Sequence, residues 1–182
     1  MNMLRKNSVA IVAMVLMIVL GTLVGSHNSL AKIRNKAADS FVLGARGDGI
    51  GIQSDLRERD NAAYNLVVIA RRYLPEGNAL IQNVLRERAA AQEAASVKEK
   101  AGADKALEVA FRDLYDVLSG MALSEQDARY PQRLLTDFLS AGDRISHDPY
   151  NQAAADFNRV LATFPAGLLG ALTGIRPMEL FA

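Results

Sequence analysis

Two histidines are the side chains of this chain best suited to acid–base or metal chemistry, and neither stands in a catalytic pattern. His27 lies at the end of a long apolar stretch, and His147 lies in the sequence Ser-His-Asp-Pro. Helical bundles that bind two metal ions use Glu-x-x-His pairs on facing helices. The positions three residues earlier hold Val24 and Arg144, which excludes this kind of site. We therefore expect His147 to be a surface or helix-capping residue.

Other reactive arrangements have equally little support. The chain has no cysteine, which excludes disulfides, thiolate nucleophiles and cysteine-ligated metal sites. No serine stands in a nucleophile elbow. The glycine-rich segment 44–51 fits neither phosphate-binding nor dinucleotide-binding spacing. Its Arg46-Gly47-Asp48 tripeptide is an integrin ligand in some extracellular proteins, but turn residues of this kind are common. The sequence predicts no catalytic residue, no metal ligand and no cofactor, and a protein that is not an enzyme.

Two asparagines near the C-terminus are of more interest. Asn151 and Asn158 are seven residues apart, so they share one side of an expected helix, next to Tyr150 and Phe157. We interpret them as buried or half-buried amides that fix helix register through hydrogen bonds. The alternative is that they line a ligand pocket together with His147.

Charge and composition narrow the function classes further. The net charge is +1, from 21 basic and 20 acidic residues, and this balance argues against a nucleic-acid-binding protein. Tryptophan is absent and aromatic residues are few, so stacking platforms for sugars or bases are not expected. Clusters of alternating charge, such as residues 57–60 and 86–88, are typical of solvated helix faces. A surface that docks a partner is the alternative interpretation of these clusters.

The N-terminal part of the chain is a long apolar stretch that predicts a helix. No charged residue occurs between Lys6 and Lys32. A helix of about 20 apolar residues crosses the hydrocarbon core of a bilayer. We predict a short tail at residues 1–6 and a transmembrane helix at residues 7–31. A signal peptide cleaved after Ala31 is the alternative, but the apolar run is longer than the usual ~7–15 residues.

The flanking charges leave the orientation of this helix open. More basic residues follow the apolar stretch than precede it, which favours a cytoplasmic C-terminal domain. A short N-terminal tail translocates reluctantly, which favours the opposite arrangement. We expect a single-pass protein of the cell membrane, and the side on which its soluble domain lies stays open.

Residues 32–165 are expected to form a soluble bundle of long antiparallel helices. Apolar residues recur at helical spacing, and no useful β-alternation occurs. Residues 44–51 should break the first helix, Asp104 should cap a later helix, and Tyr130-Pro131 should open another. Asp148-Pro149 should begin the last helix, which carries an apolar face from Tyr150 to Phe164. The fold class is therefore all-α, resembling a four-helix bundle.

The remaining residues, 166–182, form an apolar tail with two possible places. The segment is too short to span a bilayer, so it either caps the bundle or lies in the membrane interface. We favour capping, since few basic residues accompany the apolar ones.

The chain resembles the LemA family at both ends. The juxtamembrane residues Asn28 to Asn35 look like that family's motif, and a second set of residues follows in the family's order near the C-terminus. This set is Tyr130-Pro131, Arg144-Ile145, Tyr150-Asn151, Phe157-Asn158, Phe164-Pro165, Leu168-Leu169 to Gly174, and Phe181. The resemblance implies a bacterial single-pass membrane protein with a bundle of long antiparallel helices, and neither enzymatic activity nor cofactor. Two departures, at residues 44–51 and at Asp148-Pro149, imply a broken first helix and a kinked or shorter final one.

These observations together predict a non-enzymatic interaction or scaffold protein of the cell envelope. Its partners would be the lipid bilayer and a protein. A small-ligand-binding or enzymatic bundle is one alternative, and a soluble domain secreted after signal-peptide cleavage is another.

Overall fold

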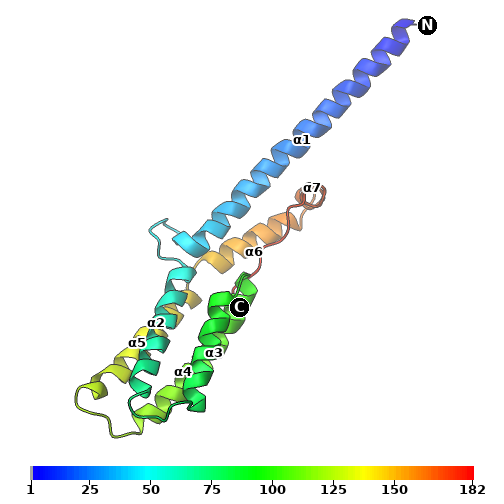
Figure 1. Cartoon of the computed structure of the whole chain (residues 1–182). Helices are drawn as coiled ribbons and strands as arrows, with labels where there is room; N and C mark the ends of the chain where they lie inside the picture. Colours follow the sequence, from blue (N-terminus) through cyan, green and yellow to red (C-terminus); the bar gives the residue numbers. More distant parts are fainter. Residues whose placement is uncertain (1) are drawn as a thin grey trace. The chain divides into compact units, whose positions relative to one another are not determined.

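The structure, a computed structural model, describes the backbone of residues 2–182 and the side chains of residues 8–182 (Figure 1). The all-α prediction is confirmed, because no strand occurs among these residues. The α-helices are α1 (Asn2–Leu43), α2 (Ile52–Ala70), α3 (Ala79–Glu93), α4 (Val97–Ser119), α5 (Tyr130–Ser146), α6 (Tyr150–Leu161) and α7 (Ala166–Thr173), and a 3₁₀-helix, η1 (Asp127–Arg129), precedes α5. The expected tail at residues 1–6 lies wholly outside the residues whose side chains are described.

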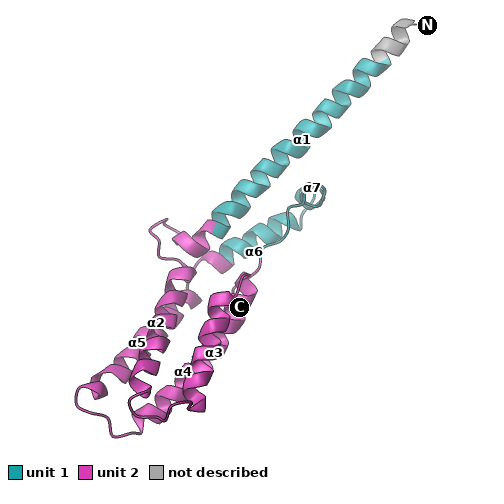
Figure 2. Ribbon diagram, viewed as in Figure 1, with its two compact units in different colours: residues 1–38, 152–178 teal, residues 39–151, 179–182 magenta. Residues whose placement is uncertain are grey.

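The chain divides into two compact units, shown in different colours in Figure 2. Unit 1 contains residues 1–38 and 152–178, and unit 2 contains residues 39–151 and 179–182. The buried apolar residues of unit 1 are Leu30, Ala37, Ala154, Phe157, Leu161 and Met178. Unit 2 holds the helical bundle.

Helix α1 runs without a break through the apolar stretch and the charged residues that follow it. It ends at Leu43, where the glycine-rich segment begins, as the sequence predicts. Gly44 adopts a φ of +73°, and a Cβ atom there would overlap the main chain of Ile50. Only glycine tolerates both the left-handed backbone and this close approach. Asp48 stabilises the turn by accepting a hydrogen bond from the Ile50 amide (3.0 Å).

The bundle of unit 2 is built from α2, α3, α4 and α5, which alternate in direction along the chain (Figure 1). Helix α2 packs most extensively against α5, and α3 against α4. This up-and-down order follows from short connections, which place consecutive helices side by side and antiparallel. Helices α2 and α4 therefore run in the same direction across the bundle.

The bundle core is apolar and closely packed. Phe111 of α4 and Phe138 of α5 stack with ring centroids 4.2 Å apart and an interplanar angle of 13°. Around this pair lie aliphatic side chains from α2, α3 and α4: Leu66, Val67, Ile81, Val84, Leu107, Leu114 and Leu118. The recurrence of these residues at helical spacing is what made the bundle predictable.

Helix α4 begins earlier than expected. Its N-cap is Ser96, whose hydroxyl accepts a hydrogen bond from the Glu99 amide (3.1 Å), while the Glu99 carboxylate accepts one from the Ser96 amide (2.9 Å). This reciprocal capping box outweighs the cost of Gly102 inside the helix. The prediction that Asp104 caps a helix is wrong, since Asp104 lies in the interior of α4.

The later helices agree better with expectation. Tyr130-Pro131 begins α5, and Asp148 caps α6 by accepting a hydrogen bond from the Tyr150 amide (2.8 Å). The expected apolar face of α6 is buried at Tyr150 and Phe157 but not at its end. Helix α6 stops at Leu161, and Phe164 beyond it is 85% exposed.

Candidate functional site

The sequence predicts no site residues, yet unit 2 contains a buried ionic cluster that joins α2 to α4 and α5. Arg59 of α2 is only 3% exposed. Its Nη2 donates a hydrogen bond to Glu108 of α4 (2.8 Å), and its Nε lies 2.9 Å from Oδ1 of Asp104. The guanidinium also lies 4.0 Å from the ring centroid of Phe138. A buried charge needs such partners, because losing hydration costs several kcal/mol.

Gly142 of α5 provides the room that Arg59 occupies. A Cβ atom at Gly142 would overlap Nη1 of Arg59 and lie 3.3 Å from its Cζ. The backbone at Gly142 is ordinary helix, so the requirement for glycine at this position is one of space.

Asp104 is the less well compensated member of the cluster. Although it is within ion-pair distance of Arg59, the angle is unsuitable for a hydrogen bond, so Asp104 Oδ1 and Arg59 Nε have no hydrogen-bond partner among the described residues. Burial raises the pKa of Asp104 to about 6; attraction to Arg59 opposes this shift and repulsion from Glu108 adds to it. For Glu108, burial acts in the same direction, but hydrogen bonds from Arg59 and Arg112 outweigh it and lower the pKa.

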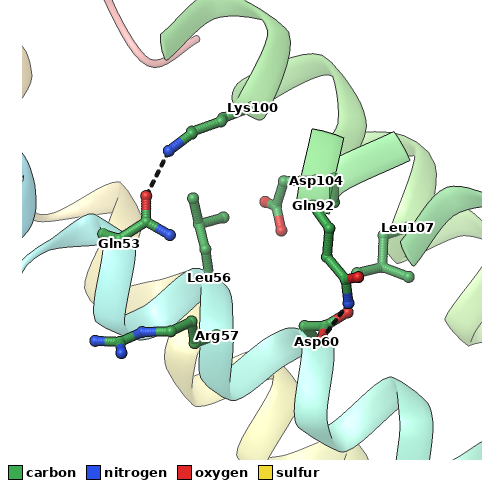
Figure 3. A pocket seen from close by; sticks show the side chains of 9 residues that line it. Gln53, Leu56, Arg57, Asp60, Gln92, Lys100, Asp104 and Leu107 are labelled. Carbon is green, nitrogen blue, oxygen red and sulfur yellow. Dashed lines mark hydrogen bonds between the residues drawn. The ribbon is translucent and has the colours of Figure 1, made fainter. Parts of the chain in front are cut away.

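A cavity of about 230 Å³ opens beside this carboxyl group, between α2, α3 and α4. Figure 3 shows Asp104 between Leu56 and Gln92, which also line the cavity. Lys100 donates a hydrogen bond to Oε1 of Gln53 (2.5 Å) at one side. Asp60, at the other side, accepts hydrogen bonds from Arg88 (2.8 Å) and Gln92 (3.2 Å). The apolar part of the lining is formed by Leu56, Ala91 and Leu107.

The chemistry available here is limited. A carboxyl group with a pKa of about 6 changes its protonation near neutral pH. It has no neighbouring histidine, and no group of three acidic or histidine side chains that could hold a metal ion occurs in the described part of the chain. The arrangement is suited to accepting a hydrogen bond from a small ligand.

A second ion pair and a polar loop cluster are further polar contacts of the bundle. Arg144 of α5 donates to Asp55 (2.7 Å) and pairs with Glu58, both on α2. In the segment between α4 and α5, Asp127 of η1 accepts hydrogen bonds from the Tyr73 hydroxyl (2.6 Å) and from Arg72 (2.7 Å). Its pKa is lowered, chiefly by the hydrogen bond from Tyr73.

The two asparagines bind the C-terminal segment of the chain. In unit 2, Asn151 donates to the carbonyl of Phe181 (2.7 Å) and accepts from its amide (2.8 Å). In unit 1, Asn158 makes the same pair of bonds with Met178 (2.9 and 2.7 Å). Both amides thus satisfy main-chain groups, in agreement with a structural role. His147 is exposed and lies at the C-cap of α5.

Sequence reasoning missed Arg59 and Asp104, although a signal existed. Arg59 lies four residues before Ala63 and seven before Leu66, so it falls on the buried face of α2. Asp104 lies three residues before Leu107 and seven before Phe111 on α4. A charged residue at a core position of each helix is the pattern of a buried ion pair. The local charge alternation around Arg59 had favoured a solvated face instead.

Comparison with known proteins identifies a family for this chain. The model of the LemA family matches residues 50–182, more than half of the chain. The matched region includes the C-terminal residues that carry the resemblance, whereas the juxtamembrane residues 28–35 lie outside it. The comparison with curated proteins found no match.

Proposed function

Because this chain belongs to the LemA family, we propose that it is a non-enzymatic interaction protein of the cell envelope, held in the membrane by α1. The observation that carries the anchor is the exposure of α1. Residues 8–43 contain a window of mean hydropathy 2.6, none of which is buried. A core helix of a soluble protein would bury such a window, so a bilayer is the natural environment for these side chains.

The continuity of α1 favours an anchor over a signal peptide. The helix continues past Ala31 to Leu43 without a break. In unit 2, Phe41 of the same helix is buried and packs against the rings of Tyr150 (5.1 Å between centroids) and Phe181 (6.1 Å). A helix that is both apolar at one end and part of a folded core at the other links the domain to the membrane.

Two measurements test the anchor. The full-length protein should stay in the membrane pellet after a carbonate wash, and its intact mass should include residues 1–31. Release into the supernatant, or a mass lacking about the first 30 residues, the usual length of a signal peptide, would favour the secreted domain instead.

The way in which the bundle uses its polar groups supports the interaction role. Its core is apolar, and its buried charges pair with one another. The family is not known as an enzyme family. Affinity capture from detergent extracts should recover a stoichiometric protein partner. A variant with scrambled surface residues on the bundle is the control, and equal recovery with both would contradict the role.

The cavity beside Asp104 supports a second candidate function, the binding of a small hydrogen-bond donor. The supporting observation is that the Asp104 carboxyl group lines the cavity, while its buried Oδ1 faces Arg59. Small primary amines should perturb amide NMR signals of α2 and α4 in the parent protein. Leu56→Trp, which fills the cavity, should abolish the perturbation. Absence of any perturbation in the parent would remove this candidate.

A further inference from the structure

We propose that α7, together with the preceding Phe164, is a second lipid-contacting element that lies in the interface of the bilayer crossed by α1. The proposal rests on the proposed function, since it requires α1 to be in a membrane. It adds a binding surface and assigns the lipid bilayer as its partner.

The composition of this segment fits a lipid environment. No charged residue occurs between Arg159 and Arg176. The three most exposed large apolar side chains of the segment are Phe164 (85%), Leu172 (66%) and Leu168 (56%). They are spaced four residues apart, so those on α7 share one face of the helix. Exposed apolar side chains clustered in this way mark an interaction surface.

The opposite side of α7 packs within unit 1. Gly170 is buried, and a Cβ atom there would lie 3.6 Å from Cγ of Leu161, closer still to its Cδ1. A shallow groove is lined by Gly25, Ser26, Ser29 and Leu30 of α1 and by Pro165, Ala166 and Leu169 at the start of α7. These contacts place α7 beside residues 25–30 of α1.

The position of α7 beside residues 25–30 identifies the lipid bilayer as its partner. Residues 25–30 are the last turns of the charge-free stretch, immediately before Lys32. A transmembrane helix leaves the hydrocarbon at such a boundary, where basic side chains reach the headgroups. The exposed face of α7 therefore lies at the depth of the interface. Arg176 follows α7 as Lys32 follows the apolar stretch of α1.

The lack of a basic polar face on α7 does not oppose this assignment. A free amphipathic helix needs electrostatic attraction or a large apolar area to bind a membrane. Helix α7 is already held at the bilayer by α1, so its binding is intramolecular and needs only the burial of its apolar face.

The absence of tryptophan makes a direct test possible. Single-tryptophan variants of the full chain would be reconstituted in phosphatidylcholine–phosphatidylglycerol vesicles with brominated acyl chains. Phe164→Trp and Leu168→Trp report on the segment, Leu16→Trp on α1, and Tyr130→Trp on the bundle. We expect quenching at residues 16, 164 and 168 and none at residue 130.

The outcomes separate the two proposals. Quenching at residue 16 without quenching at residues 164 and 168 would overturn the lipid contact and leave the anchor intact. Emission from residue 168 that is blue-shifted but unquenched would mean that protein covers the face, and would also overturn it. A tryptophan at residue 16 that is not quenched would remove the anchor and this proposal with it.

A second variant tests the same face without relying on one probe. Leu172→Asp in the Phe164→Trp background should abolish the quenching at residue 164. The matched control is Val109→Asp on α4, which replaces a similarly exposed apolar residue (60%) of the bundle and should leave the quenching unchanged. Circular dichroism checks that both variants remain folded. Unchanged quenching in Leu172→Asp would contradict the proposal.

Discussion

Gly142 gives the sharpest test of the buried ionic cluster. Alanine is the better helix former, so a glycine-to-alanine change inside a helix normally stabilises by about 0.5–1 kcal/mol. At Gly142 the added methyl group would overlap the guanidinium of Arg59. Gly102, in the interior of α4, has no atom within 4 Å of its would-be Cβ and provides a matched control.

The expected magnitude follows from how tightly Arg59 is held. The side chain is only 3% exposed and is fixed by Asp104, Glu108 and the ring of Phe138. Overpacking a filled site costs about 1–3 kcal/mol, and disturbing a buried ion pair adds to this. After the gain in helix propensity, we expect Gly142→Ala to destabilise the bundle by about 1–3 kcal/mol. Gly102→Ala should instead stabilise it by about 0.5–1 kcal/mol.

Thermal unfolding of the full chain in mild detergent, followed by circular dichroism, would measure both variants. Each kcal/mol corresponds to about 4 °C in Tm for a domain of this size. In the Arg59→Met background, Gly142→Ala should cost much less than it does in the parent, because the guanidinium that the methyl group would overlap is gone. If Gly142→Ala raised Tm as much as Gly102→Ala, Arg59 would not be confined as described and the reasoning would fail.

Three further predictions concern single polar groups. Folding raises the pKa of Asp104 from 3.8 to about 6, so its charged form opposes folding above pH 6 and this cost disappears as the pH falls towards 4. Asp104→Asn should therefore gain stability over the parent as the pH rises from 4 to 7, by up to about 3 kcal/mol, measured as the difference between two urea titrations. Asn151→Ala removes both hydrogen bonds to Phe181 and should cost about 1–3 kcal/mol, seen as faster hydrogen exchange of the Phe181 amide. Ser96→Ala breaks the capping box of α4 and should lower the unfolding free energy by about 0.5–2 kcal/mol, measured by chemical denaturation.

The sequence was sufficient for the fold because the fold depends on patterns within single helices. The apolar spacing of Leu107, Phe111, Leu114 and Leu118 predicted the core face of α4, and the four glycines of residues 44–51 predicted the end of α1. Helix boundaries were less predictable where two local signals competed. Gly102 predicts a turn, but α4 begins before it, because the capping box at Ser96 stabilises the earlier helix start with two reciprocal hydrogen bonds.

The ionic cluster could not be predicted in the same way, because it depends on contacts between helices. Arg59 and Asp104 are 45 positions apart, and although each stands at a core position of its own helix, the pattern within one helix does not say which charge it will meet. Only the packing of α2 against α4 and α5 brings them together and removes their water. Likewise, the sequence predicts that the segment of α7 is apolar, but only the packing within unit 1 places α7 beside residues 25–30 of α1.

The distribution of ion pairs assigns a particular role to the first half of α2. Within one and a half turns, Asp55 pairs with Arg144 of α5, Arg59 with Asp104 of α4, and Asp60 with Arg88 of α3. Apolar stripes alone allow helices to slide past one another by a turn, whereas a misplaced buried charge loses its partner and costs about 3–5 kcal/mol. We infer that this segment fixes the register of all three neighbouring helices. Replacing both partners, Arg59 by Met and Asp104 by Leu, should then leave stability nearly unchanged while broadening the amide NMR signals of α4 and α5, because the bundle would lose its unique register.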